Sequence, residues 1–387
     1  GDVNGDGYGD LIVGAYQADP NEPNAGATYV VYGRPDVSGD KIGTSIDLAE
    51  ITADVGGFVI NGALENDQSG YSVSSAGDVN GDGYDDLIVG APYADPNASG
   101  SGASFVVFGS ASGSTFELAD LTTGAVTDPA SGFVINGYSE EDYSGFSVSG
   151  AGDVNGDGLD DLIVGSPGSD PNGELSGASF VVFGKTDGAA IELSSIEANS
   201  NEVPVGFMIS GVAVNDTSGR SSVSGAGDVN GDGFAGLLVG APFDSPNGSS
   251  SGASFVVFGD NFTQSVTNVG TTDGETLTGT IDNDIIFAGE GDDTINGTSG
   301  EDRLSGGNGA DVFIFSRDDG TSIITDFSTM DGDQVDVSKF GFANWAELQP
   351  HLTATIGNNT QLTLDTDTFV YFEDIVYDEL SETDFII

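Results

Sequence analysis

The stretch Asp78–Pro92, which reads DVNGDGYDDLIVGAP, places oxygen-bearing side chains at the spacing of a metal-binding loop. Its first, third, fifth and ninth positions are Asp78, Asn80, Asp82 and Asp86, and the seventh, Tyr84, offers a backbone carbonyl. Alternate side chains on a tight loop converge on one point, and Gly83 at the sixth position allows the sharp turn. Several carboxylates without His or Cys favour calcium over zinc or copper, while magnesium would require a more rigid octahedron. The loop therefore predicts a calcium site.

The same loop occurs three more times, at intervals of about 75 residues. The first copy has Asp2, Asn4, Asp6 and Asp10 with the Tyr8 carbonyl; the third has Asp153, Asn155, Asp157 and Asp161 with the Leu159 carbonyl. The fourth copy has Asp228, Asn230 and Asp232, but Gly236 at the ninth position, so we expect it to bind calcium more weakly. Asp-Asn-Gly loops are also good turns. However, carboxylates within about 5 Å repel by roughly 1 kcal/mol per pair even in a wet site, and a plain turn gains nothing from that repulsion.

These loops lie inside a longer repeat of short β-rich runs. Ser69–Gly109 and Ser144–Gly184 agree almost throughout, Ser218–Gly259 is a further copy, and Gly1–Gly33 is a copy without its first run. Each unit holds four runs, such as YSVSS, DLIVGA, ASFVVFG and GFVING, separated by turn residues. Four short strands per repeat are typical of a β-propeller blade, and the fixed period argues against a sandwich of unrelated strands. We expect an all-β chain with about three and a half blades in residues 1–260.

A second repeat, with a period of nine, starts at Gly279, Ala288, Gly297 and Gly306, with a weaker copy at Gly270. Its sixth position is Asp284, Asp293, Asp302 and Asp311, and its eighth position is apolar. One inward apolar residue per nine, beside a Gly-rich turn, predicts a short parallel β-roll over residues 261–315 rather than a flexible linker. Residues 316–387 lack both periods and predict a small mixed cap, with a short amphipathic helix in Phe342–Leu352 and strands or a hairpin in Thr360–Ile375.

Composition limits the partners and the compartment. The chain has 63 Asp and Glu against 7 Lys and Arg, a net charge of -56, which argues against nucleic acid and anionic lipid surfaces as partners and favours cations. It has no Cys, so no disulfide and no thiolate metal site can form. No apolar run approaches the roughly 20 residues of a membrane span.

The 75-residue units resemble the FG-GAP repeat of integrin α-chain propellers and bacterial surface proteins. GAP stands at Gly90–Pro92 and Gly240–Pro242, with GSP at Gly165 and GAY at Gly14. The resemblance covers about residues 1–260 and implies calcium bound between the first two strands of each blade. Propellers of this family usually close with seven blades.

The nine-residue units resemble the RTX, or haemolysin-type, calcium-binding repeat, whose pattern Gly-Gly-x-Gly-x-Asp-x-apolar-x matches best at Gly306–Ile314. That family places ions between stacked turns. Turns two apart stack on the same side, so we expect Asp284 to face Asp302 and Asp293 to face Asp311. The tail, with ITDFSTMDGDQVDVSKFG and the ending DFII, is similar to the C-terminal region of RTX proteins that leave the cell through a type I exporter.

We expect no enzymatic activity and no catalytic residue. The single His, His351, lies in the expected tail helix, where capping is a more ordinary role than acid–base chemistry. The Gly-x-Ser-x-Gly match at Gly248–Gly252 falls in a loop that varies between units. Glycosidases use a carboxylate pair, but the regularly spaced carboxylates here are explained by calcium.

The sequence therefore predicts a secreted bacterial calcium-binding protein, located outside the cell or on its surface. Its expected role is a calcium-stabilised adhesion or ligand-binding scaffold, with an extracellular protein or polysaccharide as ligand. The alternative is a non-catalytic C-terminal part of a larger exported hydrolase. The chain begins at Gly1 inside a loop motif and without Met, so we expect further sequence upstream, which would distinguish these two roles.

Overall fold

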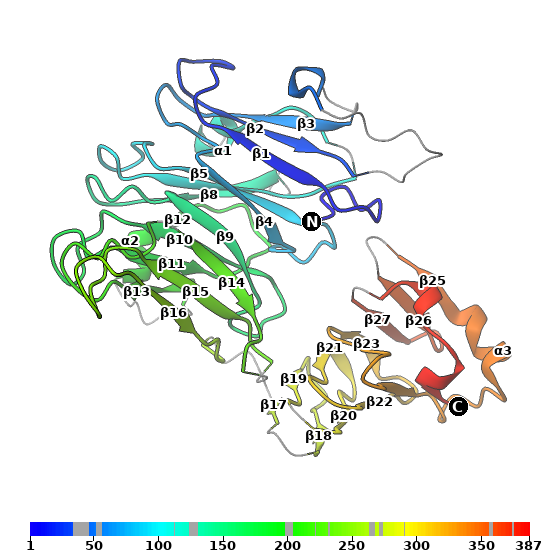
Figure 1. Ribbon diagram of the computed structural model, residues 1–387. Coiled ribbons are helices and arrows are strands. Elements are labelled where there is room, and N and C mark those ends of the chain that lie inside the picture. The colour runs from blue at the N-terminus through cyan, green and yellow to red at the C-terminus, as the bar shows by residue number, and fades with distance from the viewer. Residues whose placement is uncertain are drawn as a thin grey trace. The chain divides into compact units, whose positions relative to one another are not determined.

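The computed structural model describes residues 1–33, 46–51, 56–111, 113–123, 131–197, 204–220, 222–230, 233–262, 268–270, 274–289, 291–355, 359–373 and 375–387. Its regular structure is almost entirely β (Figure 1). The chain forms two compact units. One comprises Gly1–Val154, Leu159–Gly227 and Gly236–Val257, and the other comprises Asn155–Gly158, Asp228–Ala235 and Phe258–Ile387.

The first unit consists of antiparallel blades, as the repeat predicts. The second and third copies each have four strands: β4 (Ser72–Gly77), β5 (Asp86–Ala91), β6 (Ala103–Val107) and β8 (Gly132–Asn136), then β9 (Ser147–Gly152), β10 (Asp161–Ser166), β11 (Ala178–Val182) and β13 (Gly206–Ser210). The first copy has β1 (Leu11–Ala15), β2 (Ala27–Val31) and β3 (Gly57–Asn61). The fourth has β14 (Val223–Gly227), β15 (Gly236–Ala241) and β16 (Ala253–Val257). The fold is therefore the expected propeller-like arrangement of about three and a half blades.

Alternation along the strands explains how the blades stack. In β5, Leu87 and Val89 pack in a core shared with the first copy, whereas Ile88 packs in a core shared with the third. Strands covered on both faces read as continuous apolar runs, which is why DLIVGA lacks a polar face. Each fully buried aliphatic side chain contributes roughly 1.5–3 kcal/mol.

An additional strand covers the outer edge of two blades. β7 (Phe116–Glu117), followed by α1 (Leu118–Thr123), pairs in parallel with β3, and β12 (Ile191–Glu192), followed by α2 (Leu193–Glu197), pairs in parallel with β8. Each of these strands belongs to the repeat copy that follows, in the sequence, the blade whose edge it covers. Glu117 accepts hydrogen bonds from the side-chain amides of Asn21 and Asn61, both at 2.7 Å. Glu192 accepts from Asn97 and Asn136 at 2.8 Å, so the same connection between successive blades occurs twice.

The second unit contains two parallel sheets formed by alternating turns, as expected for a β-roll. One sheet contains β17 (Asn268–Val269), β19 (Ile285–Phe287), β21 (Gly300–Ser305) and β23 (Gly320–Ile324). The other contains β18 (Thr276–Thr278), β20 (Thr294–Asn296), β22 (Val312–Ile314), β24 (Gln334–Asp336) and β28 (Phe385–Ile386). The eighth-position side chains Ile286, Ile295, Leu304 and Phe313 are fully buried between the sheets.

The C-terminal residues extend this roll, and the core continues across residues 315 and 316 without a break. β27 (Thr368–Phe372) pairs in parallel with β23 and then antiparallel with β26 (Thr360–Thr363), which pairs with β25 (Leu352–Ala354). The strands predicted in residues 360–375 are therefore present. Figure 1 shows these strands and the short helix α3 around the C-terminal end of the roll.

The helix predicted over Phe342–Leu352 is shorter than expected. Only α3 (Trp345–Leu348) is α-helical, and it continues as the 3₁₀ turn η3 (Gln349–His351). Pro350 lacks an N–H and cannot extend the α-helical ladder. Leu348 is nevertheless fully buried, and Phe342 and Trp345 pack on the same core, so the predicted apolar face is correct. Among the described residues, further 3₁₀ turns are η1 (Leu48–Glu50), η4 (Tyr377–Glu379) and η5 (Glu382–Asp384). No helix among the described residues has the length and apolar character needed to cross a membrane.

Candidate calcium sites

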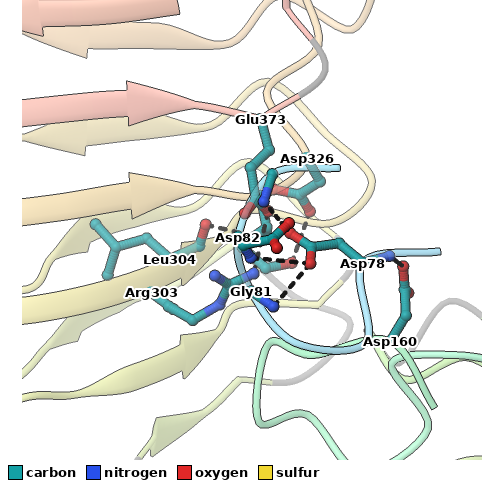
Figure 2. A network of polar contacts seen from close by, with 11 residues as sticks. Asp78, Gly81, Asp82, Asp160, Arg303, Leu304, Asp326 and Glu373 are labelled. Atoms are coloured by element: carbon teal, nitrogen blue, oxygen red, sulfur yellow. Dashed lines mark hydrogen bonds and ion pairs between the residues drawn. The ribbon is translucent and has the colours of Figure 1, made fainter. Parts of the chain in front are cut away.

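The second loop is organised by hydrogen bonds from its own backbone. Figure 2 shows the Asp78 carboxylate accepting from the N–H groups of Gly81 and Asp82, at 2.7 and 3.0 Å. Its second oxygen accepts from Gly83 at 2.8 Å. Asn80 Oδ1 accepts from the Asp82 N–H at 2.8 Å, and Asp82 Oδ1 accepts from the Tyr84 N–H at 3.0 Å. These bonds fix the side chains of positions one, three and five on the inside of the turn.

The other copies repeat this geometry. In the first loop, Asp2 accepts from Asp6 and Gly7 at 3.1 and 2.7 Å, and Asp6 accepts from Tyr8 at 2.9 Å. In the third, Asn155 accepts from the Asp157 N–H at 2.8 Å; in the fourth, Asp228 accepts from Gly233 at 2.8 Å. The sixth-position glycines Gly7, Gly83, Gly158 and Gly233 have φ between 84° and 86°, as the predicted turn requires. Asp232 lies outside the described residues.

The ninth-position aspartate has a second role that the motif did not reveal. Asp86 begins β5 and is fully buried; its carboxylate accepts from Val79 N–H at 2.9 Å and from Gly109 N–H at 2.8 Å. It therefore connects the start of the loop to the end of the third strand. Asp10 forms the equivalent bonds with Val3 and Gly33, and Asp161 forms them with Val154 and Gly184.

Burial makes this position electrostatically costly when no cation is present. Desolvation, together with the nearby Asp78 and Asp82 carboxylates, raises the pKa of Asp86 from 3.8 to about 8, against the opposing effect of its two N–H donors. A buried carboxylate beside two others requires a compensating charge to remain ionised at neutral pH.

The strand register shows how the fourth copy differs. Asp86 and Asp161 lie opposite Gly77 and Gly152 across a β-bulge, and Gly236 lies opposite Gly227 at the same place. The predicted difference at the ninth position is therefore the loss of one carboxylate from an otherwise conserved strand geometry.

The loops fit calcium through their donor chemistry. Within the described residues, no three His, Cys, Asp or Glu side chains gather closely enough to hold an ion, because the loop carboxylates are turned toward backbone N–H groups. The donors are all oxygens, the sixth-position turn geometry recurs in each copy, and the ninth-position carboxylates of Asp86 and Asp161 are fully buried. These are the properties that hard divalent cations require.

In the β-roll the predicted pairs face one another. The Asp284 N–H donates to Asp302 Oδ1 at 3.0 Å, and the Asp293 N–H donates to Asp311 Oδ1 at 2.8 Å. The weak first repeat joins the same ladder, because Glu275 N–H donates to Asp293 at 2.7 Å. Asp333 extends the ladder by accepting from Asp311 N–H at 3.0 Å. The nine-residue period could not identify Asp333, because it lies 22 residues after Asp311 rather than 18.

The second oxygen of three of these carboxylates is buried without a hydrogen-bond partner in the described part of the chain: Asp293, Asp302 and Asp311 Oδ2. A Cβ on Gly297 or Gly306 would collide with Oδ2 of Asp302 or Asp311, so glycine at the first position makes room for these oxygens. Burial, and then the charges of Asp284 and Asp293, raise the pKa of Asp302 and Asp311 to about 6. Anionic oxygens in this state fit a cation held between the turns.

The two features that the sequence analysis weighed for catalysis, His351 and the Gly248–Gly252 segment, lie outside the calcium loops and the aspartate ladder. His351 Nδ1 lies 2.7 Å from the Thr363 carbonyl oxygen, and its ring packs against Phe342 at 4.9 Å. The Gly248–Gly252 segment lies in the loop between β15 and β16.

Comparison with known protein families agrees with both repeats. The FG-GAP repeat matches residues 1–31, 69–107, 144–182 and 220–257. The RTX calcium-binding nonapeptide repeat matches residues 269–304, 278–313 and 289–321.

The relatives include integrins and an enzyme. Integrin alpha-PS2 of Drosophila melanogaster is 32% identical over 186 residues, which are 48% of this chain and 12% of that protein. Integrin alpha-7 of Rattus norvegicus is 33% identical over 167 residues, 43% of this chain and 12% of the relative. Phosphatidylinositol-glycan-specific phospholipase D of Bos taurus is 29% identical over 229 residues, 56% of this chain and 24% of the enzyme. The chain thus spans less than a quarter of the length of each of these relatives.

Proposed function

We propose that this chain, which carries four FG-GAP repeats and RTX calcium-binding nonapeptide repeats, is an extracellular protein whose folding depends on calcium. The observation that carries this proposal is the set of buried, unpartnered carboxylate oxygens on Asp293, Asp302 and Asp311. Leaving a buried anion without a partner costs several kcal/mol, and a cation between the turns removes that cost.

The ion pairs among the described residues do not involve these oxygens. Arg303 pairs with Glu373 at 3.1 Å (Figure 2), and Lys185 pairs with Asp187 at 2.6 Å. Even if every basic side chain formed such a pair, 7 cations would leave most of the 63 acidic groups unbalanced. External divalent ions are therefore the natural counter-charge. Sites of the extracellular type, with Kd on the order of 10⁻⁴–10⁻³ M, fill outside a cell and convert binding energy into folding energy.

The finer role that we propose is a bacterial adhesion or ligand-binding scaffold with an extracellular protein or polysaccharide as ligand. Integrin relatives of the blade region support it. We further propose that residues 316–387 direct export through a type I exporter. Low calcium inside the cell would leave the acidic roll loosely folded, and the absence of Cys would leave the chain free of cross-links during export. Normal secretion of a chain lacking about sixty C-terminal residues, expressed beside a type I exporter, would contradict this part.

The alternative role is a non-catalytic part of a larger exported hydrolase. The phospholipase D relative favours this alternative, because its match covers 56% of this chain but only 24% of the enzyme. The neighbouring sequence of the intact protein decides between the two roles. Further blades would support the scaffold, and a domain with clustered catalytic side chains would support the hydrolase.

Calcium-dependent folding can be tested by far-UV circular dichroism and thermal melting of the full chain. We expect a large increase in the melting temperature between EDTA and about 5 mM calcium, and a much smaller one with magnesium at the same concentration. Replacing both Asp302 and Asp311 by Asn should remove much of the calcium response, whereas Glu140→Gln at an exposed position should not. Identical melting in EDTA and calcium would refute the proposal.

A further inference from the structure

The eighth position of the loops holds an additional aspartate, Asp85 in the second copy and Asp160 in the third, that belongs to none of the ligand positions. Each of these carboxylates contacts the loop of the preceding blade. Asp160 Oδ2 accepts the backbone N–H of Asp78 at 2.8 Å, a bond shown in Figure 2, and Asp85 Oδ2 accepts the backbone N–H of Asp2. In both cases the donor is the first ligand residue of the neighbouring loop.

Backbone hydrogen bonds reinforce the same junction. Asp160 N–H donates to the Asp78 carbonyl at 3.1 Å, and Asp85 N–H donates to the Asp2 carbonyl at 3.2 Å. One residue further along, the Val79 carbonyl accepts from Lys185 N–H at 2.9 Å. The Val3 carbonyl accepts from Ser110 N–H at the same distance. The first two residues of each of these loops are therefore held by the next blade, in the same way at two successive junctions.

The residue before the loop is adapted to this carboxylate. Gly77 has a φ of 73°, and a Cβ on it would collide with the Asp160 carboxylate. A Cβ on Gly1 would collide with Asp85 in the same manner. The glycine before each first ligand thus leaves the space that the eighth-position aspartate of the next blade fills.

We propose that Asp85 and Asp160 are positioning residues, and that each sets the calcium affinity of the loop in the preceding blade. The bond to Asp78 N–H fixes the backbone of the first ligand residue, whose side chain in turn accepts from Gly81, Asp82 and Gly83. Asp160 would therefore preorganise the second loop without binding its ion. The fourth copy has Ala235 at this position and contributes no carboxylate. This inference rests on the proposed calcium binding by the loops.

The seventh positions provide an optical test specific to each loop. Tyr8 and Tyr84 occupy this position in the first two loops, whereas the third and fourth have Leu159 and Phe234. A terbium ion in a loop takes excitation energy from an adjacent tyrosine and emits, and calcium then displaces it. The emission of a Tyr8→Phe chain minus that of a Tyr8→Phe/Tyr84→Phe chain isolates the second loop. The reciprocal pair isolates the first.

We expect Asp160→Ala to weaken calcium binding at the second loop by about tenfold, the effect of losing one hydrogen bond, and to change the first by less than about twofold. Asp85→Ala should do the reverse, weakening the first loop although Asp85 lies within the second. Asp160→Asn keeps an acceptor oxygen and should restore most of the affinity. The loop that does not respond serves as the folding control in each chain, and Glu140→Gln controls for lost charge.

Three outcomes would overturn the inference: no change at either loop, a loss confined to the mutated residue's own loop, or an Asn variant as weak as the Ala variant. In the last case charge, and not positioning, would be responsible. Absence of any tyrosine-dependent emission that calcium displaces, in chains with native loops, would contradict calcium binding by these loops and this inference with it. Emission without the directional pattern would contradict this inference alone.

Discussion

Replacing the buried ninth-position carboxylate distinguishes two roles that it could have, a structural connection and a calcium ligand. Asp86→Asn keeps the size of the side chain and removes its charge. Asp86 is fully buried, accepts two backbone N–H groups, and lies near the Asp78 and Asp82 carboxylates. If it serves mainly as a structural connection, the variant should lose stability under all conditions. If it is present to bind a cation, the variant should lose mainly the response to calcium.

The magnitudes follow from the pKa. Without calcium, raising the pKa of Asp86 from 3.8 to about 8 costs the folded state about 4 kcal/mol at pH 7. The Asn variant avoids this cost, but its NH₂ group must face one of the two backbone N–H donors, which costs about 1–3 kcal/mol. We therefore expect the variant to be more stable than the native chain in EDTA by roughly 1–3 kcal/mol. It should also lose the contribution of its site in calcium, about 2.7 kcal/mol at 100 times Kd.

Urea unfolding at pH 7, in EDTA and in saturating calcium, measures both quantities. Asp161→Asn in the third copy is an independent repeat, and Glu140→Gln is the control for an exposed charge. A variant that loses the same stability in EDTA and in calcium would refute the reasoning, because the carboxylate would then act only as a connection between the loop and Gly109.

Three further predictions test other parts of the molecule. Folding raises the pKa of Asp302 and Asp311 from 3.8 to about 6 and that of Asp333 to about 7, so in EDTA the folded state binds protons more tightly than the unfolded chain. The free energy of unfolding in EDTA should therefore fall as the pH rises from about 4 to about 7. Melting temperatures that rise between pH 5 and pH 8 in EDTA would contradict this. Glu117→Ala removes the acceptor for Asn21 and Asn61 and should lower the free energy of unfolding by about 1–2 kcal/mol, and Glu192→Ala should do the same in the next blade. The control Glu140→Ala should have little effect. Equal effects of all three variants would argue against the connection between blades. Gly236→Asp places a carboxylate at the strand register of Asp86. The attraction of this carboxylate to a divalent ion, less its repulsion by the two carboxylates already in the loop, amounts to about 2 kcal/mol, so calorimetry should show the fourth loop binding calcium roughly thirtyfold more tightly. An unchanged number and strength of sites would contradict the argument that affinity follows the number of carboxylate ligands.

Much of the fold could be predicted because its repeats are locally complete. The run DLIVGA defines a strand buried on both faces, and the loop before it defines a turn with glycine at a positive φ. The nine-residue period likewise defines which aspartates stack, because a parallel roll brings together residues 18 positions apart. Each of these features is determined by neighbours in the sequence.

The parts that could not be predicted depend on contacts between copies. In the sequence, Asp85 belongs to the second loop, and only the stacking of blades brings its carboxylate to the backbone N–H of Asp2. Glu117 reads as one of many surface acids until β7 pairs with the preceding blade and brings it beside Asn61. One signal was available: FELAD at 116–120 and IELSS at 191–195 repeat with the blade period and conserve the glutamate.

The continuation of the roll beyond its repeats has a similar cause. After Phe315 the chain inserts additional residues into its turns, so the period vanishes although the strands keep their parallel partners. Asp333 retains the position of the ladder because β24 pairs with β22 and brings its carboxylate below Asp311. Periodicity detects equal spacing, whereas the sheet requires only that each turn returns to the same edge.

The two units therefore reach the same electrostatic state by different folds. In each, a strand begins at or beside an aspartate whose carboxylate is buried and held by backbone N–H groups, and the next copy places another carboxylate nearby. Backbone donors lower the pKa of these groups but do not offset burial, because the pKa of Asp86, Asp302 and Asp311 stays above 3.8. Folding thus concentrates negative charge that the chain's own seven basic residues cannot neutralise. We therefore propose that a cation that binds only the folded chain replaces the proton uptake that compensates these carboxylates in its absence, which would link folding of the blades and of the roll to the same external ion.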